Sequence, residues 1–179
     1  MKTGTILKIL YVLSWIIFIG VCIEAGSFIV NAIFALANPA VVTHLWQQVD
    51  LSDLFNYDHG YFFVVTLIMS IVAVMKAGLF YLIIKILHNK KVNMTHPFSK
   101  EVRRLIFLLS YIALVIGLFS GYGVKYIGWL IKQGVKMPDT HYLRLGGADV
   151  WVFMAVILFV IAQIFKRGIE IQTENELTV

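Results

Sequence analysis

The chain has 179 residues, of which 60% are hydrophobic and 14% are charged, and its formal net charge at pH 7 is +5. A mean hydropathy of +0.85 is more apolar than a soluble core of this length could bury, which excludes an ordinary soluble protein and predicts an integral membrane protein. The positive charge does not predict nucleic-acid binding, because the cations lie in short segments beside apolar stretches, where topology and anionic lipid account for them.

Four apolar segments follow one another along the chain, and each is long enough to cross a bilayer at 1.5 Å rise per residue. They cover about residues 6–36, 61–87, 105–130 and 148–165. The first is too long for a simple crossing, so it tilts or continues along the interface. We therefore predict an all-α integral membrane protein whose residues 1–179 form a single four-helix transmembrane bundle.

Residues 85–104 are the basic connection between the second and third segments and hold six of the fifteen Lys and Arg residues. The positive-inside rule places such a short basic loop in the cytoplasm. The connection after Pro39 lacks Lys and Arg up to Lys76 and contains three Asp residues, so it is predicted outside. Ten of the fifteen cations then lie inside, and both the N-terminus and the C-terminus are predicted to be cytoplasmic.

Glu24 and Lys76 are charges within apolar segments, where a charged side chain costs about 2.5 to 3.5 kcal/mol on insertion scales. Gly20, Ser27 and Asn31 share a helix face with Glu24, so this face is predicted to point at other helices. Two interpretations stay open. Either Glu24 and Lys76 pair directly within an internal polar path, or Glu24 is solvated at an outer mouth while Lys76 snorkels inward or bonds backbone carbonyls.

In the third segment, Gly117 and Gly121 form a G-x-x-x-G motif, which allows two helix backbones to approach closely. Packing within the chain is favoured over a dimer seam, and the motif predicts no oligomeric state.

The sequence has no catalytic or cofactor motif: there is no H-E-x-x-H, no G-x-S-x-G, no phosphate-binding loop and no dinucleotide-binding glycine pattern. The His and Asp residues of the outer loops match no compact metal-ligand spacing. The lone Cys22 has no evident base partner. We therefore predict no enzyme, no cofactor and no metal site.

The C-terminal segment, residues 166–179, begins with Lys166 and Arg167, which are predicted to stop the fourth helix at the inner surface. After them, Gly168 either bends the chain or sits in a continuing helix. Its carboxylates are predicted to face the basic connection, and its apolar end to dock in a groove. We call the predicted surface the cytoplasmic patch; it comprises Pro97, Phe98, Ser99, Arg103, Arg104, Glu170, Glu174, Glu176 and Leu177. Ser99 is predicted to cap the third helix, since its side chain can accept an N–H from the first turn.

Two segments, "HPFSKEVRRL" before the third helix and "FKRGIEIQTENELTV" at the end, resemble the bacterial membrane family called domain of unknown function 2975. The resemblance implies a small four-helix, multi-pass protein of the bacterial cytoplasmic (inner) membrane. Members have no established activity, and many are encoded beside a small helix-turn-helix transcription factor.

The leading functional hypothesis is therefore a non-enzymatic membrane partner or sensor that acts through its cytoplasmic loop and tail, with a helix-turn-helix regulator as the suggested partner. The rival class is a small transporter or channel component with an intramembrane polar path. An immunity-like or stress-protective membrane protein fits the same sequence.

Overall fold

The computed structural model describes residues 3–38, 42, 49–88 and 98–176. Its helices are, in chain order, α1 (Thr3–Ala37), α2 (Ser52–Tyr57), α3 (His59–His88), α4 (Lys100–Lys132) and α5 (Ala148–Glu176). Four of them are long and apolar enough to cross a membrane, and no strand occurs among the described residues. The all-α prediction with four such helices is confirmed, and the sides on which the termini lie stay a prediction.

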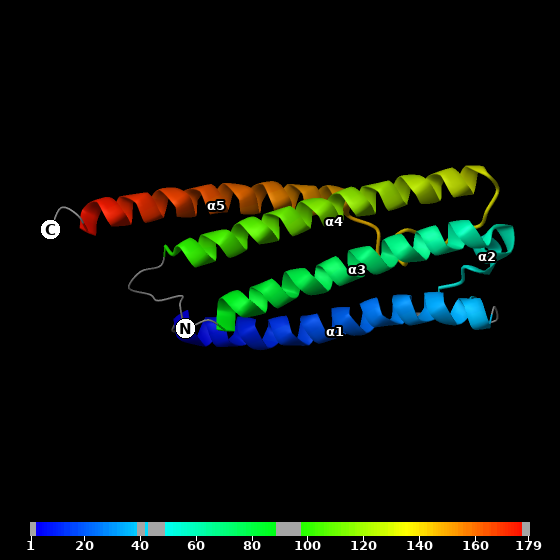
Figure 1. Cartoon of the computed structure of the whole chain (residues 1–179), viewed down its shortest axis with the longest axis horizontal. Helices are drawn as coiled ribbons and strands as arrows, with labels where there is room; N and C mark the ends of the chain where they lie inside the picture. Colours follow the sequence, from blue (N-terminus) through cyan, green and yellow to red (C-terminus); the bar gives the residue numbers. More distant parts are fainter. Residues whose placement is uncertain (1–2, 39–41, 43–48, 89–97, 177–179) are drawn as a thin grey trace.

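The four long helices lie side by side in one row rather than in a closed bundle (Figure 1). α1 packs on α3, α3 packs on α4, and α4 packs on α5, whereas no described Cα atom of α1 lies within 8 Å of α4 or α5. The four predicted helices are thus present, and their arrangement is a row in which α1 and α5 are the outer members. Lipid tails are as apolar as the exposed faces of these helices, so the hydrophobic effect does not drive the two outer helices of the row together.

Burial follows the same order. In the most apolar 18-residue window of each helix, 6% of the residues of α1 and 11% of those of α5 are buried, against 50% in α3. The stripe of α3 that faces its neighbours contains Phe62, Val65, Met69 and Val72, which recur at helical spacing and are almost fully buried. α3 is thus the centre of the core.

α4 and α5 approach each other closely at the predicted small-residue motif. A Cβ atom at Gly117 would lie 2.7 Å from Val152 Cγ2 and 3.1 Å from the carbonyl oxygen of Ala148. A Cβ at Gly121 would meet Ala148 at 3.6 Å. Ser110 strengthens the same interface, because its hydroxyl donates to the carbonyl of Ala155 over 2.8 Å. The G-x-x-x-G motif therefore lies at a contact within the chain.

The connection between α4 and α5, residues 133–147, folds back along the helices (Figure 1). Leu143 and Leu145 are 0% and 1% exposed, and a Cβ at Gly123 of α4 would lie 2.9 Å from Leu145 Cδ1. As a result α5 begins beside Gly117, near the middle of α4. We call residues 133–147 the returning loop. The returning loop packs against the core, and the side of the membrane on which it lies stays a prediction.

α5 also ends later than predicted. It continues through Lys166 and Arg167 to Glu176, about three turns past the predicted end at residue 165. Lys and Arg are good helix formers, and the Arg167–Glu170 pair at i,i+3 supports the helix locally, so the two cations do not stop it. The predicted end at residue 165 is too early, and the alternative in which Gly168 sits in a continuing helix agrees with the structure.

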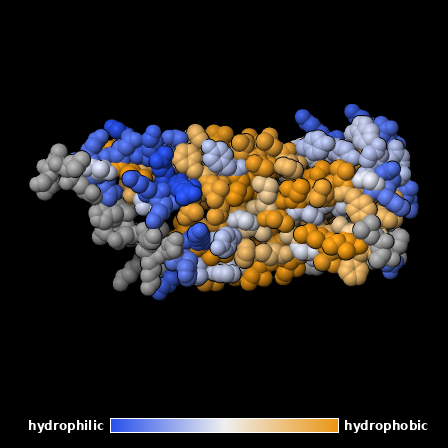
Figure 2. Space-filling model, viewed as in Figure 1, coloured by the Kyte–Doolittle hydropathy of each residue, from blue (hydrophilic) through white to orange (hydrophobic). Residues whose placement is uncertain are grey.

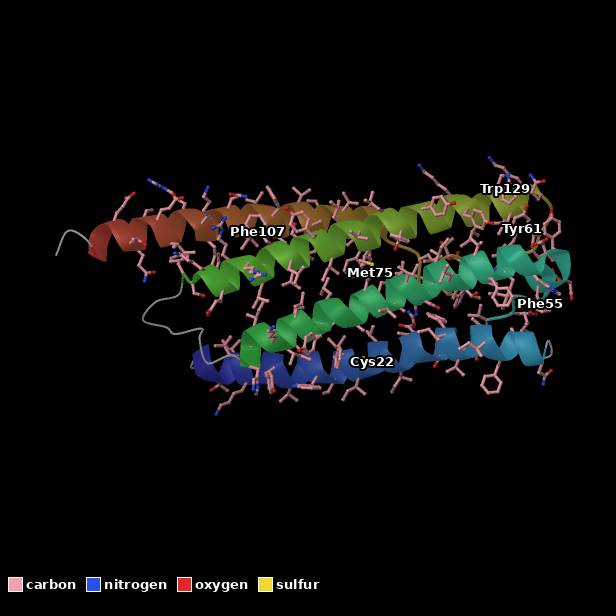
Figure 3. The ribbon with its side chains drawn as sticks, viewed as in Figure 1. Cys22, Phe55, Tyr61, Met75, Phe107 and Trp129 are labelled. Carbon is pink, nitrogen blue, oxygen red and sulfur yellow. The ribbon has the colours of Figure 1, made fainter. Side chains whose placement is uncertain are left out.

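An apolar belt separates two hydrophilic ends (Figure 2). One end holds the start of α4 and the end of α5. The other holds α2, which was not predicted, and an aromatic group in which Tyr61 packs on Trp129 with ring centroids 5.5 Å apart (Figure 3). α2 is held by Leu54 and Phe55, which are buried. Tyr and Trp at the edge of the belt are typical of a membrane interface.

Candidate functional site

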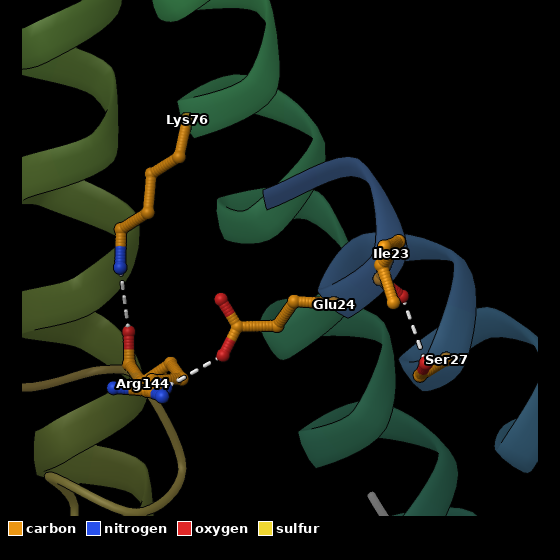
Figure 4. A network of polar contacts seen from close by, with 5 residues as sticks. All are labelled: Ile23, Glu24, Ser27, Lys76 and Arg144. Atoms are coloured by element: carbon orange, nitrogen blue, oxygen red, sulfur yellow. Dashed lines mark hydrogen bonds and ion pairs between the residues drawn. The ribbon is translucent and has the colours of Figure 1, made fainter. Parts of the chain in front are cut away.

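Charged side chains from three elements meet between the helices (Figure 4). Glu24 comes from α1, Lys76 from α3 and Arg144 from the returning loop. Arg144 Nε donates to Glu24 Oε1 over 2.6 Å, and Lys76 Nζ donates to the backbone carbonyl of Arg144 over 2.9 Å. Lys76 Nζ also lies 5.7 Å from the ring centroid of Trp151 on α5. We call Glu24, Lys76 and Arg144 the charged cluster.

The backbone of Arg144 is held in an unusual conformation. Its φ angle of 58° lies in the left-handed region, which costs a residue other than glycine of the order of 1–3 kcal/mol. The buried side chains of Leu143 and Leu145 fix the loop on both sides, and the Leu145 N–H donates to Thr140. Arg144 is therefore held against Glu24 by the packing of its neighbours as well as by the ion pair.

The electrostatics of the cluster are unbalanced, since two cations meet one carboxylate. The Arg144 side chain is 39% exposed and that of Glu24 is 17% exposed, so the protein encloses the pair only in part. The ring face of Trp151 offers Lys76 an additional favourable contact. Such a cluster can bind a small anion or hold the loop in place.

The sequence left two interpretations open. A direct Glu24–Lys76 ion pair does not occur among the described residues, where Arg144 bonds both side chains instead. Lys76 bonds a backbone carbonyl, as the other interpretation had it. Sequence reasoning missed Arg144 and counted it as an outer-loop cation. A signal was available in residues 143–147, Leu-Arg-Leu-Gly-Gly, which precede an unusually short final apolar segment. A short segment next to glycines indicates a chain that enters the membrane region before its helix begins.

The polar face predicted on α1 does not point inward as a unit. Ser27 donates to the carbonyl of Ile23 in its own helix, and Gly20 is exposed. Asn31 is half-buried and borders a small cavity beside Phe28. The buried stripe of α1 comprises Ser14, Ala25, Phe28 and Ala35.

At the hydrophilic end that holds the end of α5, Ser99 and Phe98 fix the start of α4. The Ser99 hydroxyl accepts from the Val102 N–H over 3.1 Å, which is the cap that the sequence indicates. The Phe98 ring packs on Phe165 with centroids 5.3 Å apart and lies directly over Gly168 of α5. The last residues before α4 and the second half of α5 therefore touch.

Only part of the predicted cytoplasmic patch lies among the described residues, so the predicted contact between its carboxylates and the basic connection stays a prediction. Glu170 pairs with Arg167 of its own helix over 3.2 Å. The Arg103 guanidinium lies 5.3 Å from the centroid of Phe107. Arg104 and Glu174 are exposed. Pro97 and Leu177 lie outside the described residues, as does the side chain of Glu176.

Among the described residues there is no group of three or more His, Cys, Asp or Glu side chains that could hold a metal ion. Cys22 is exposed on α1 (Figure 3).

Four long apolar helices with charges held between them define the class: a multi-pass helical membrane protein. A family model described as protein of unknown function (DUF2975) matches residues 46–179. The chain therefore belongs to this family, as the two sequence segments predicted. No curated protein and no solved structure matches. The matched region includes Lys76 and Arg144, whereas Glu24 precedes it.

Proposed function

We propose that this chain is a non-enzymatic membrane partner or sensor of the bacterial inner membrane, which acts on a cytoplasmic protein. The observation that supports this most is the continuity of one segment. The returning loop, held at Arg144 by Glu24 and Lys76, leads into α5 within a few residues, and α5 then runs unbroken to Glu176. Arg144 and the far end of α5 thus belong to one continuous segment, in which the helix begins at Ala148, four positions after Arg144.

This continuity supplies a route for signalling. A ligand or a change of lipid that breaks the Glu24–Arg144 bond would free the returning loop. Because α5 is a stiff helix that rests on Gly117, a shift at its start would displace its far end by a similar distance. The returning loop would then have a held and a released conformation. Such a ligand must bind one of these conformations more tightly than the other, because only a difference in affinity shifts the equilibrium between them.

The orientation proposed for this mechanism puts both termini in the cytoplasm, and the distribution of cations along the chain supports it. Reporter fusions after Val179 and within residues 38–53 should report opposite compartments. The same compartment for both fusions would overturn the orientation.

The proposed partner binds α5 beyond Phe165 together with the start of α4. The family resemblance suggests a helix-turn-helix regulator. A photo-crosslinking residue at Ile171, which is 45% exposed, should capture such a protein in living cells. The matched control is Phe153, which is 67% exposed on the apolar part of the same helix and should capture none. Adducts at both positions, or at neither, would contradict the proposal.

A transporter or channel component is the second candidate, and the charged cluster between the helices is the observation that favours it. Vesicles containing the purified chain separate the two candidates. A solute or ion flux that Lys76→Met abolishes would support transport, whereas the leading proposal expects no flux beyond that of empty vesicles.

A further inference from the structure

A groove of about 630 Å³ opens between α3 and α4, near the end of the molecule that holds the start of α4. It lies apart from the charged cluster. Its lining has two chemical parts. The polar part comprises Lys85, Glu101 and Arg104, and the apolar part comprises Leu82, Leu105, Phe107, Leu108 and Tyr111.

The two cations of the groove come from different helices. Lys85 lies in the last turn of α3 and Arg104 in the second turn of α4, and both side chains are exposed. Neither forms an ion pair with a residue in the described part of the chain. Lys85 and Arg104 outnumber the single carboxylate of Glu101, which has an interaction of its own. The polar part thus offers cationic donors to an anion.

Arg103 adds to the positive charge beside the groove. Its guanidinium rests 5.3 Å from the ring centroid of Phe107, which is itself a lining residue. Its Nε is buried and has no hydrogen-bond partner within the described residues. Arg103 therefore contributes positive charge next to the groove and does not line it.

The apolar part continues from the cations toward the middle of the helices. Leu105, Leu108 and Tyr111 lie at successive spacings of three on α4, so they form a strip that leads away from Arg104. In Figure 2 the hydrophilic surface at this end gives way to the apolar belt. The groove therefore has cations at the level of lipid headgroups and an apolar wall at the level of acyl chains.

We propose that this groove binds one anionic phospholipid, with its phosphate on Lys85 and Arg104 and an acyl chain along Leu105 and Leu108. The charge complementarity favours an anionic lipid over a zwitterionic one. The apolar strip favours a lipid over a free phosphate, because a free phosphate leaves the strip without an occupant.

The test uses the full-length chain purified in a neutral detergent. Native mass spectrometry measures how much lipid it retains when phosphatidylglycerol or phosphatidylcholine with the same acyl chains is added. We expect at least fivefold more of the anionic lipid to be retained. Equal retention of the two lipids would overturn the proposal. Glycerol phosphate carries the phosphate but no acyl chain, so at equal concentration it should displace little of the bound lipid. Full displacement of the lipid by glycerol phosphate would also overturn the proposal.

A double variant that combines Lys85→Gln with Arg104→Gln should lose most of the preference for the anionic lipid. A double variant that combines Lys85→Arg with Arg104→Lys keeps both charges and should keep this preference. The matched control is Lys125→Gln with Lys132→Gln, which removes two cations from the other half of α4 and should leave retention unchanged. Retention as high in the first pair as in the wild-type chain would overturn the assignment of the site. The comparison of the two lipids on the wild-type chain stands even if that pair fails to fold.

Discussion

The two halves of this molecule are held together by different forces. In the half that contains the start of α4, which we call the helix half, α4 and α5 pack with a glycine at the contact and a serine hydroxyl bonded across it. In the other half, which we call the loop half, the returning loop occupies the place of a helix. It is fastened by buried leucines and by the polar bonds of Arg144.

The difference indicates which half of the molecule can change conformation when a single contact is broken. Backbone packing in lipid depends on close fit over many atoms and has no single point of release. A loop that is held partly by charged contacts, as this one is at Arg144, can be loosened by changing one charge. The loop half is therefore the part expected to respond to a signal, and the helix half the part expected to transmit it.

The largest effect is expected from Glu24→Gln, which leaves Arg144 without its counter-charge. Breaking a fully buried ion pair costs about 3–5 kcal/mol, and the partial exposure of Arg144 reduces the expected loss to about 2 kcal/mol. Unfolding by detergent titration measures it. In a Cys22→Ser chain, a cysteine at Leu145 should also react faster with a water-soluble maleimide once Glu24 is replaced.

The matched control is Glu170→Gln, the same substitution in the exposed Arg167–Glu170 pair, whose side chains are 66% and 43% exposed. It should change the free energy of unfolding by less than about 0.5 kcal/mol. Equal losses in the two variants would mean that the ion pair of the charged cluster does not hold the loop half.

The second effect tests the helix half. Gly117→Ala places a methyl group 2.7 Å from Val152 Cγ2 and 3.1 Å from two backbone atoms, so α5 must move away. Overpacking of this kind is expected to cost about 1–2 kcal/mol of unfolding free energy. Gly128→Ala is the control, because nothing lies within 4 Å of its Cβ, and the better helix former should leave stability unchanged or raised. Similar results for the two alanines would show that α4 and α5 fit loosely.

Much of the helix half could be predicted from the sequence, since it follows from local rules. The Ser99 cap and the Gly117 motif are short patterns whose geometry is nearly fixed by chain chemistry. The end of α5 was missed for the opposite reason. Lys166 and Arg167 mark a change of polarity, and a helix can cross such a boundary without ending.

The loop half could not be predicted in the same way. Arg144 is separated from Glu24 by 120 positions, and only the folding back of the returning loop brings them together. A topology rule assigns each loop to one side of the membrane and says nothing of how deeply a residue of that loop lies among the helices. The order of the helices in the row likewise depends on contacts between residues far apart in the sequence.

A smaller effect on stability is expected at Ser99, the N-cap of α4. Ser99→Ala removes the oxygen that accepts from the Val102 N–H, and the loss of such a cap typically costs about 1 kcal/mol. The same change at Ser27, whose hydroxyl bonds only its own helix, should have almost no effect on stability. Thermal unfolding followed by circular dichroism distinguishes the two. A larger loss at Ser27 would indicate that the polar face of α1 carries more of the structure than the cap does.

The smallest effect is expected from Gly168→Ala, although its added Cβ would come closest of all, 2.6 Å from Phe98 Cδ1. The atoms that it meets belong to one aromatic ring, and the Phe98 side chain is 36% exposed, so the ring can swing aside. At Gly117 the obstacle includes the backbone of α5, which cannot. The cost of moving the ring should nearly cancel the gain in helix propensity, which leaves a net change within about 0.5 kcal/mol.

A double-mutant cycle with Phe98→Ala isolates that cost. Without the ring, Gly168→Ala should stabilise the chain by up to about 1 kcal/mol, because only the propensity term remains. If Gly168→Ala instead destabilises the wild-type chain as much as Gly117→Ala does, the contact of Phe98 with α5 is rigid. The junction between the start of α4 and the end of α5 would then be a fixed part of the helix half, and a signal reaching α5 would have to move both helices together.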